Sequence, residues 1–151
     1  MSQSIKEHVL EEIKKAMRAQ EKDRLMVLRL ISSEIKRIEV DERIQLDTAR
    51  ELAVLDKMQK QRRDSFSQFT AAGREDLAAK EQFEMDIIQT FMPAALTDAE
   101  IRQLIEAAIK ESSATSPQEM GKVMAILKPK LQGRADIGQV SAQVKNLLAG
   151  N

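Results

Sequence analysis

The sequence predicts an all-α protein, in which an N-terminal bundle of about four helices precedes a small three-helix C-terminal domain. Only 3 % of the 151 residues are aromatic, and Trp and Tyr are absent, which disfavours β-sheets. Apolar residues recur every three or four positions along most of the chain, which is the spacing of amphipathic helices. A chain of this length buries roughly 70 % of its extended surface on folding, enough for a real core.

Residues 1–95 are predicted to form the N-terminal helical domain. A first helix is expected near Gln3–Ala19, because apolar residues recur at intervals of four from Ile5 to Met17. Asp23 is expected to be the N-cap of a second, central helix with a broad apolar stripe that ends near Ile38.

Two further helices are expected in the same domain. Thr48 and Glu51 have the spacing of a capping box, so a third helix should begin there and run to about Ala72, just before Gly73. A fourth helix should follow directly and be stopped by Pro93, because the residue before a proline is pushed out of the helical region.

Residues 96–151 are predicted to form a separate three-helix domain. Its first helix should begin at a capping box formed by Thr97 and Glu100. The second should begin at Ser116, with Glu119 closing another capping box, and should end at Pro129. The last should follow the turn Gly133–Asp136 and carry an apolar stripe from Ile137 to Leu148.

Several kinds of enzyme chemistry are excluded by composition. Without Cys, and with His8 as the single His, the chain has no disulfide, thiol nucleophile or His-cluster metal site. Phosphate-binding loops, zinc-protease motifs and nucleophile elbows are also absent. His8 is expected to be an ordinary surface or edge histidine. We therefore assign no catalytic residue, metal or cofactor, and expect no enzymatic activity of the chain on its own.

Charge and hydropathy indicate a soluble protein in the cytoplasm. The N-terminal residues alternate charged and apolar side chains, and no apolar run approaches the roughly 20 residues that span a bilayer. The formal net charge is zero, so any site for an anion must be local and DNA binding is not expected.

One cluster of basic residues lies in the predicted third helix and comprises Lys57, Lys60, Arg62 and Arg63. Arg62 occupies a position in the apolar stripe of that helix, and a polar break in such a stripe can mark a site. The alternative is that Arg62 covers the edge of the core while Lys60 forms i to i+4 pairs with Asp56 and Asp64.

A second basic cluster lies near the C-terminus. Between residues 121 and 151, five basic residues face Asp136 alone, for a net charge of +4. Such a segment suits a phosphate backbone, and with no aromatic residue after Phe91 it would recognise RNA by backbone and shape. The alternative is ordinary solvated charge that partly serves a helix C-terminus. The candidates are Lys122, Lys128, Lys130, Arg134 and Lys145.

The sequence resembles the YqeY family along essentially its whole length. The C-terminal part carries the resemblance most specifically, through the segments 120–124, 127–130, 133–136, 140–141 and 144–145, and the N-terminal part contributes 28–31, 60–65 and 91–93. Many relatives have Ala-Asp-Gly where this chain has Ala-Asp-Ile-Gly at 135–138, which could alter how the last helix begins.

The resemblance implies two helical domains, the second similar to the tail of the B subunit of the tRNA-dependent amidotransferase, which helps to engage tRNA. It makes Lys122, Lys128, Lys130 and Arg134 candidates for contacts with tRNA phosphates. It does not imply glutamine-dependent carbon–nitrogen ligation here, because the catalytic domain of that subunit is absent.

Two functional hypotheses follow. The first is a non-catalytic accessory protein that binds tRNA or another structured RNA through the basic C-terminal module. The second is an adaptor that docks on an aminoacyl-tRNA synthetase or an amidotransferase through apolar helix faces, without binding RNA directly. Both hypotheses rest on analogy at the level of the fold. A fold alone does not fix a function.

Overall fold

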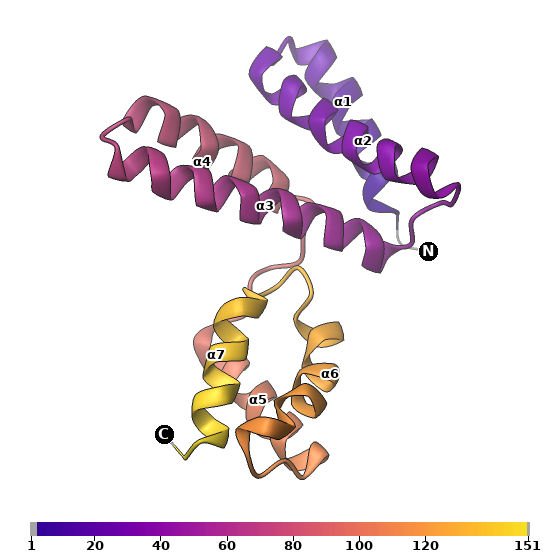
Figure 1. The fold of residues 1–151 in the computed structure, drawn as a ribbon. Helices are drawn as coiled ribbons and strands as arrows, with labels where there is room; N and C mark the ends of the chain where they lie inside the picture. The colour runs from indigo at the N-terminus through magenta and orange to yellow at the C-terminus, as the bar shows by residue number, and fades with distance from the viewer. Residues whose placement is uncertain (1–2, 151) are drawn as a thin grey trace. The chain divides into compact units, whose positions relative to one another are not determined.

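The structure, a computed structural model, describes residues 3–150 and confirms the all-α fold class, with no strand in that range (Figure 1). Contacts divide the chain into two compact units, Met1–Pro93 and Ala94–Asn151. Four helices belong to the first unit and three to the second. The helices are α1 (Ile5–Ala19), α2 (Lys22–Glu42), α3 (Thr48–Ala71), α4 (Glu75–Gln89), α5 (Asp98–Ser112), α6 (Met120–Leu131) and α7 (Ile137–Leu148), with a short 3₁₀ helix, η1 (Pro117–Glu119), before α6.

The first unit consists of two helical hairpins, α1–α2 and α3–α4 (Figure 1). The central stripe of α2 is buried as its spacing predicts, with Leu28, Ile31 and Ile35 fully inaccessible to solvent. These side chains share one core with Leu55 of α3 and Ile88 of α4. Because α2 contributes to the core along several turns, it is the central helix of this unit.

The start of α2 differs from the prediction. The helix begins at Lys22 with Glu21 as its N-cap, and no side chain caps it. The predicted N-cap Asp23 is therefore wrong. Asp23 lies in the first helical turn instead, where a carboxylate interacts favourably with the helix dipole.

The start of α3 is capped one residue earlier than predicted. Asp47 is the N-cap, and its Oδ1 accepts a hydrogen bond of 2.8 Å from the backbone N–H of Arg50. The predicted capping box of Thr48 and Glu51 is therefore wrong. Glu51 is 2 % exposed and accepts a 2.7 Å hydrogen bond from the backbone N–H of Lys6, so it ties α3 to the first turn of α1.

The ends of α3 and α4 follow the prediction. Gly73 has a φ of 72°, the left-handed conformation that glycine adopts at little cost. Helix α4 ends at Gln89, four residues before Pro93. Proline has no N–H to donate to the carbonyl of residue i−4, which here is Gln89, so the helix ends where Pro93 stops it. The Thr90 hydroxyl donates a 2.6 Å hydrogen bond to the Ile87 carbonyl, and Phe91 is buried after the helix end.

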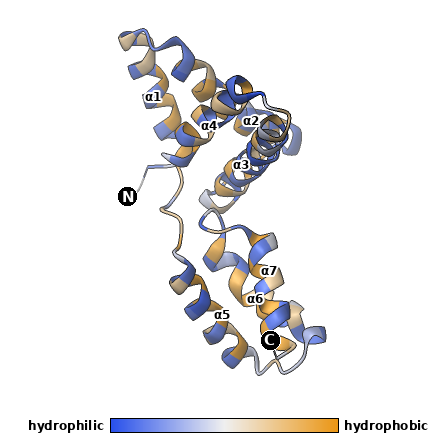
Figure 2. Ribbon diagram, turned by 90° about the vertical axis from the view of Figure 1, so that its left-hand side faces the viewer, coloured by the Kyte–Doolittle hydropathy of each residue, from blue (hydrophilic) through white to orange (hydrophobic). Residues whose placement is uncertain are grey.

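The second unit is a three-helix arrangement in which α5 and α7 each pack against α6. In Figure 2 the hydrophobic colouring is frequent along α6 and α7. The stripe predicted for the last helix is buried at Val140, Val144 and Leu148, and joins Val123 and Leu127 of α6 in a separate core.

A 3₁₀ turn, η1, directly precedes the start of α6. Ser116 is the N-cap residue of the 3₁₀ turn η1, as predicted, but its side chain forms no capping bond to the backbone, so the predicted capping box does not form. The carboxylate of Glu119 instead accepts hydrogen bonds from the Thr115 backbone N–H, the Thr115 hydroxyl and the Ser116 hydroxyl. The Thr115 backbone bond is the main reason that the pKa of Glu119 is lowered.

Pro129 does not end α6, as the sequence predicted, because the helix continues to Leu131. A proline in the last turn removes a single helical hydrogen bond, and the fully buried side chain of Leu131 holds that turn against the core. Helix α7 begins after Asp136, whose Oδ1 accepts from the backbone N–H groups of Gly138 and Gln139.

Candidate functional site

The basic residues of α6 do not share one face. Lys128 and Lys130 are exposed in the last turn, where positive charge suits the helix dipole. Residues two apart on a helix point about 200° apart, so these two lysines lie on different sides of α6. Lys122 is exposed in the first turn, with its Nζ 3.7 Å from a carboxylate oxygen of Glu119. The predicted cluster is thus distributed around the solvent-exposed part of the helix.

Lys145 lies on the same seam between helices as Lys128. The hydroxyl of Ser141 on α7 is 3.8 Å from the sulfur of Met124 on α6, so this contact marks the boundary of the two helices. Lys128 and Lys145 each follow the contact residue of their own helix by four positions, which places them on the same side of it. Both therefore border the α6–α7 seam from the solvent side.

Arg134 has a structural task that the sequence did not reveal. Its Nε donates a 3.2 Å hydrogen bond to the Ala94 carbonyl, and its own carbonyl accepts a 2.9 Å bond from the Leu96 N–H. The residue therefore fastens the segment before α5 to the connection between α6 and α7. Any anion that it binds would have to use the terminal nitrogens of the guanidinium.

The basic cluster predicted in the third helix is divided by the fold. Arg62 turns into the edge of the first core: its Nη1 donates to the Met58 carbonyl at 3.2 Å, and its Nη2 lies 3.8 Å from Glu84. This is the alternative that the sequence left open for Arg62. Lys57 lies near Glu34 and contributes to the lowered pKa of that carboxyl, whose main cause is the hydrogen bond from Arg37.

The remaining members of that cluster, Lys60 and Arg63, are exposed three positions apart on α3. Lys57 is exposed three positions before Lys60, so these three residues follow one side of the helix. Arg62 is the member that differs, because it turns into the core edge. The structure therefore does not bring the four basic residues together as one site. Gln59, also of α3, is a buried polar side chain: it is 4 % exposed and donates to the Met85 carbonyl at 2.9 Å.

His8 has partners that its position in the sequence did not suggest. Its ring packs edge-on against Phe91 with 4.8 Å between centroids, and its Nε2 is 3.8 Å from Glu12. Both contacts belong to packing within the first unit. Across residues 3–150, no group of three or more His, Cys, Asp or Glu side chains could hold a metal ion, and no described helix is long and apolar enough to cross a membrane.

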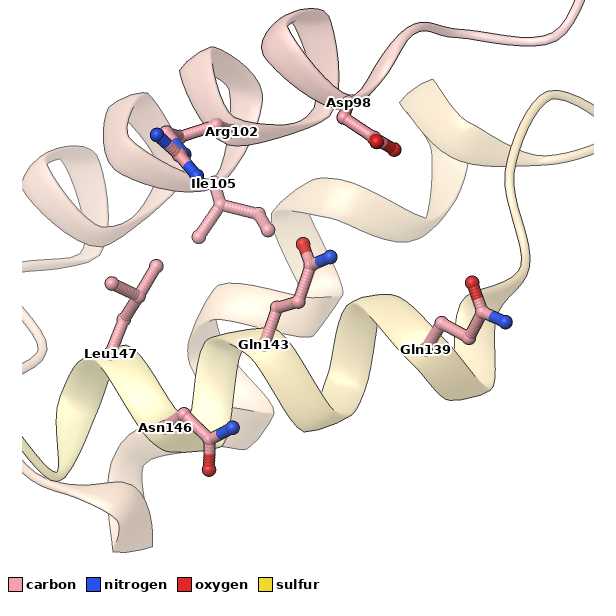
Figure 3. A pocket seen from close by; sticks show the side chains of 7 residues that line it. All are labelled: Asp98, Arg102, Ile105, Gln139, Gln143, Asn146 and Leu147. Atoms are coloured by element: carbon pink, nitrogen blue, oxygen red, sulfur yellow. The ribbon is translucent and has the colours of Figure 1, made fainter. Parts of the chain in front are cut away.

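A groove between α5 and α7, which the sequence analysis missed, has a volume of about 510 Å³. Figure 3 shows Gln143 and Leu147 of α7 pointing toward α5, where Ile105 and Arg102 lie. No single helix reveals this groove, because it forms only when both helices pack on α6. Its lining residues are Asp98, Arg102, Ile105, Gln139, Gln143, Asn146 and Leu147.

A second groove, of about 470 Å³, lies between α2 and α4 in the first unit. Three of its lining residues are exposed apolar side chains: Met26 is 63 % exposed, Leu30 46 % and Phe83 43 %. Large apolar side chains that gather on a surface often mark an interaction site. Phe83 thus leaves an aromatic side chain of α4 open to solvent at this groove.

The chain matches the model of the family described as Yqey-like protein over residues 6–148. It belongs to this family. The resemblance seen in the sequence motifs is thereby confirmed, and it includes both structural units.

Several relatives carry the name "Altered inheritance of mitochondria protein 41, mitochondrial". The protein from Eremothecium gossypii is 37 % identical over 102 residues, which are 67 % of this chain and 55 % of the relative. That from Pyrenophora tritici-repentis is 31 % identical over 144 residues, covering 91 % of this chain and 77 % of the relative. One from Saccharomyces cerevisiae is 37 % identical over 93 residues, or 60 % and 49 % of the two chains. The chain thus spans about half the length of the Eremothecium and Saccharomyces relatives.

The relatives contradict the predicted cytoplasmic location, because their names describe mitochondrial proteins. The prediction was wrong for a physical reason. It used the lack of an apolar secretory or membrane-spanning segment, and that criterion tests for secretion and membrane insertion alone. It does not distinguish the cytosol from other aqueous compartments.

Proposed function

We propose that this chain is a non-catalytic accessory protein that binds tRNA or another structured RNA through the basic residues of its second unit. The observation that carries the proposal is the uncompensated charge between residues 121 and 150. The one acid of this segment, Asp136, has a carboxylate oxygen engaged by the first N–H groups of α7. Within residues 3–150, Lys128, Lys130 and Lys145 have no ion-pair partner, so their charge faces solvent.

The arrangement of these lysines favours backbone contacts over recognition of a sequence. They project from different sides of two adjacent helices, and the second unit has no aromatic residue. Such a surface suits phosphates that curve around it, as in a folded RNA. A relation to the tRNA-dependent amidotransferase, through the similarity to the tail of its B subunit, is part of this proposal.

The test is binding of fluorescently labelled total tRNA to the purified chain, measured by anisotropy. We expect the triple variant Lys128→Glu/Lys130→Glu/Lys145→Glu to bind at least about tenfold more weakly, because three phosphate contacts are replaced by repulsion. Arg134 is left intact, since its Nε bond to Ala94 is structural.

A matched control changes the same number of charges in the first unit. The variant Lys57→Glu/Lys60→Glu/Arg63→Glu reverses three exposed basic residues of α3. We expect it to retain most of the affinity for tRNA. Equal losses in both triple variants would show that overall charge controls binding, and would contradict the assignment to the second unit.

The groove between α2 and α4 favours a second candidate function, that of an adaptor. Its exposed Met26, Leu30 and Phe83 suit an apolar ridge of a partner helix, for example on an aminoacyl-tRNA synthetase or an amidotransferase. The partner should then co-purify with the wild-type chain after nuclease treatment and in high salt. The variant Leu30→Glu should lose the partner under these conditions, whereas the control Leu10→Glu on α1 should retain it. A complex that nuclease disperses would argue against direct docking.

A further inference from the structure

The groove between α5 and α7 has a chemistry that differs from the lysine-bearing surface. Three of its lining residues, Gln139, Gln143 and Asn146, are exposed carboxamides of α7. They are spaced at i, i+4 and i+7, which places them along one side of the helix. Gln143 on this side points toward α5 (Figure 3), whereas Ser141, which contacts α6, faces elsewhere on α7.

The carboxamides are free to bind a ligand. No hydrogen bond joins the side chains of Gln139, Gln143 or Asn146 to another part of the chain between residues 3 and 150. A carboxamide offers two donors and an acceptor in one plane. When one donor and the acceptor are used together, the carboxamide can recognise the edge of a nucleic-acid base with two hydrogen bonds.

Opposite the carboxamides, α5 supplies one cation. Arg102 lines the groove one turn after Asp98, yet no ion pair joins them. Its guanidinium is therefore available for a phosphate, and the Asp98 carboxylate is available for a donor such as a ribose hydroxyl or a base amino group. Because the two charges cancel, the groove is not a general site for polyanions.

The groove also has an apolar part. Ile105 is 1 % exposed and forms its floor, while Leu147 is 43 % exposed on the α7 side (Figure 3). An aliphatic side chain can pack against the face of a base in the absence of aromatic residues. The volume of about 510 Å³ falls within the range of sites that hold small ligands.

We propose that this groove holds one unpaired nucleotide of a bound RNA. Gln143 bonds to the edge of the base, Leu147 packs against its face, and Arg102 pairs with the adjoining phosphate. Gln139 and Asn146 extend the same polar side of α7 for the neighbouring nucleotides. The inference rests on the proposed function and adds to it a site that distinguishes bases.

The test uses the full chain and four labelled RNA hairpins with the same stem and with loops of A, C, G or U. We expect the wild-type chain to favour one loop by about 5- to 100-fold, the discrimination typical of a two-bond contact between an amide and a base. Gln143→Leu should remove this preference, because it keeps the approximate size of the side chain and removes its polar group. The dependence of affinity on salt should not change, since no phosphate contact is lost.

The matched control is Gln103→Leu. Gln103 is an exposed residue of α5 that does not line the groove, so its variant should keep the loop preference. Equal affinity of the wild-type chain for all four loops, or a preference that survives Gln143→Leu, would overturn the nucleotide site while leaving the lysine surface in place. Absence of binding to all four hairpins and to tRNA would instead overturn the proposed RNA function itself.

Discussion

Glu51 shows how one side chain connects two helices. Its carboxylate is 2 % exposed and accepts the Lys6 N–H at 2.7 Å, a donor that α1 cannot satisfy internally because Lys6 lies in its first turn. The bond thus fixes the start of α1 against α3. The spacing of Thr48 and Glu51 suggested a local cap, and only the fold shows that Asp47 already performs that task.

Replacing Glu51 by Ala should destabilise the protein by about 1–3 kcal/mol, because the partly buried backbone N–H of Lys6 loses its acceptor. Glu51→Gln should cost less, since one acceptor oxygen remains. Urea unfolding followed by circular dichroism measures both free energies. The exposed Glu11→Ala serves as the control, and a loss for Glu51→Ala no larger than for the control would contradict this role.

Glu39 links stability to pH. A hydrogen bond from Lys6, followed by one from the Leu46 backbone N–H, lowers the pKa of this carboxyl in the folded state. The folded chain therefore binds fewer protons than the unfolded chain. The stabilisation is complete above the ordinary Glu pKa of about 4.3, and it is lost as the pH falls through the lowered pKa.

The variant Glu39→Gln should consequently be less stable than the wild type by about 1 kcal/mol at pH 7. The difference should shrink progressively below about pH 4 as the wild-type carboxyl becomes protonated. Urea midpoints at pH 7, 5 and 3 give the comparison. A difference that stays constant across this range would show that the charge of Glu39 is not responsible.

At the scale of elements, substitution by Ala should have opposite effects on stability at two glycines. Gly73 ends α3 with a φ of 72°, and no heavy atom lies within 4 Å of an added Cβ, so the cost of a side chain there is conformational. Gly121 lies in α6, also with open space around an added Cβ. Gly73→Ala should therefore cost about 1 kcal/mol, and Gly121→Ala should stabilise by about 0.5 kcal/mol.

Thermal unfolding of the two glycine variants checks this pair in one experiment. The midpoint should fall for Gly73→Ala and rise for Gly121→Ala. Shifts of the same sign would contradict the backbone conformation assigned to Gly73 or the helical position of Gly121.

The sequence predicted the buried sides of helices better than it predicted the helix ends. The buried stripes of α2 and α7 could be predicted because periodicity reports the side that faces a core. The ends were less certain because neighbouring residues compete for a cap, as Asp47 does with Thr48, and because burial of Leu131 carries α6 beyond Pro129. The α5–α7 groove could not be predicted, since it depends on how both helices pack on α6.

Among the candidate site residues, charge alone identified the exposed lysines but not their geometry. Arg62 and Arg134 are cations with long side chains, and each is drawn into packing by backbone carbonyls, those of Met58 and Ala94. A sequence shows that a residue is basic. It does not show which carbonyls the fold will bring near it.

For the whole molecule, the chain divides into the two compact units Met1–Pro93 and Ala94–Asn151. Each unit has its own buried apolar cluster. We therefore expect the fragment 94–151 to fold alone, although about 60 residues is near the lower limit for a stable domain. A helical circular dichroism spectrum with a cooperative thermal transition would support this expectation, whereas a featureless melt would contradict it.

The central claim, that the second unit binds RNA phosphates through Lys128, Lys130 and Lys145, is tested most directly by the salt dependence of tRNA binding. The logarithm of the binding constant should fall linearly with the logarithm of salt concentration for the wild-type chain. For the triple Glu variant the slope should be smaller in magnitude by about 2–3, which corresponds to three lost phosphate contacts. An unchanged slope and affinity in that variant would show that these lysines do not contact RNA and would contradict the claim.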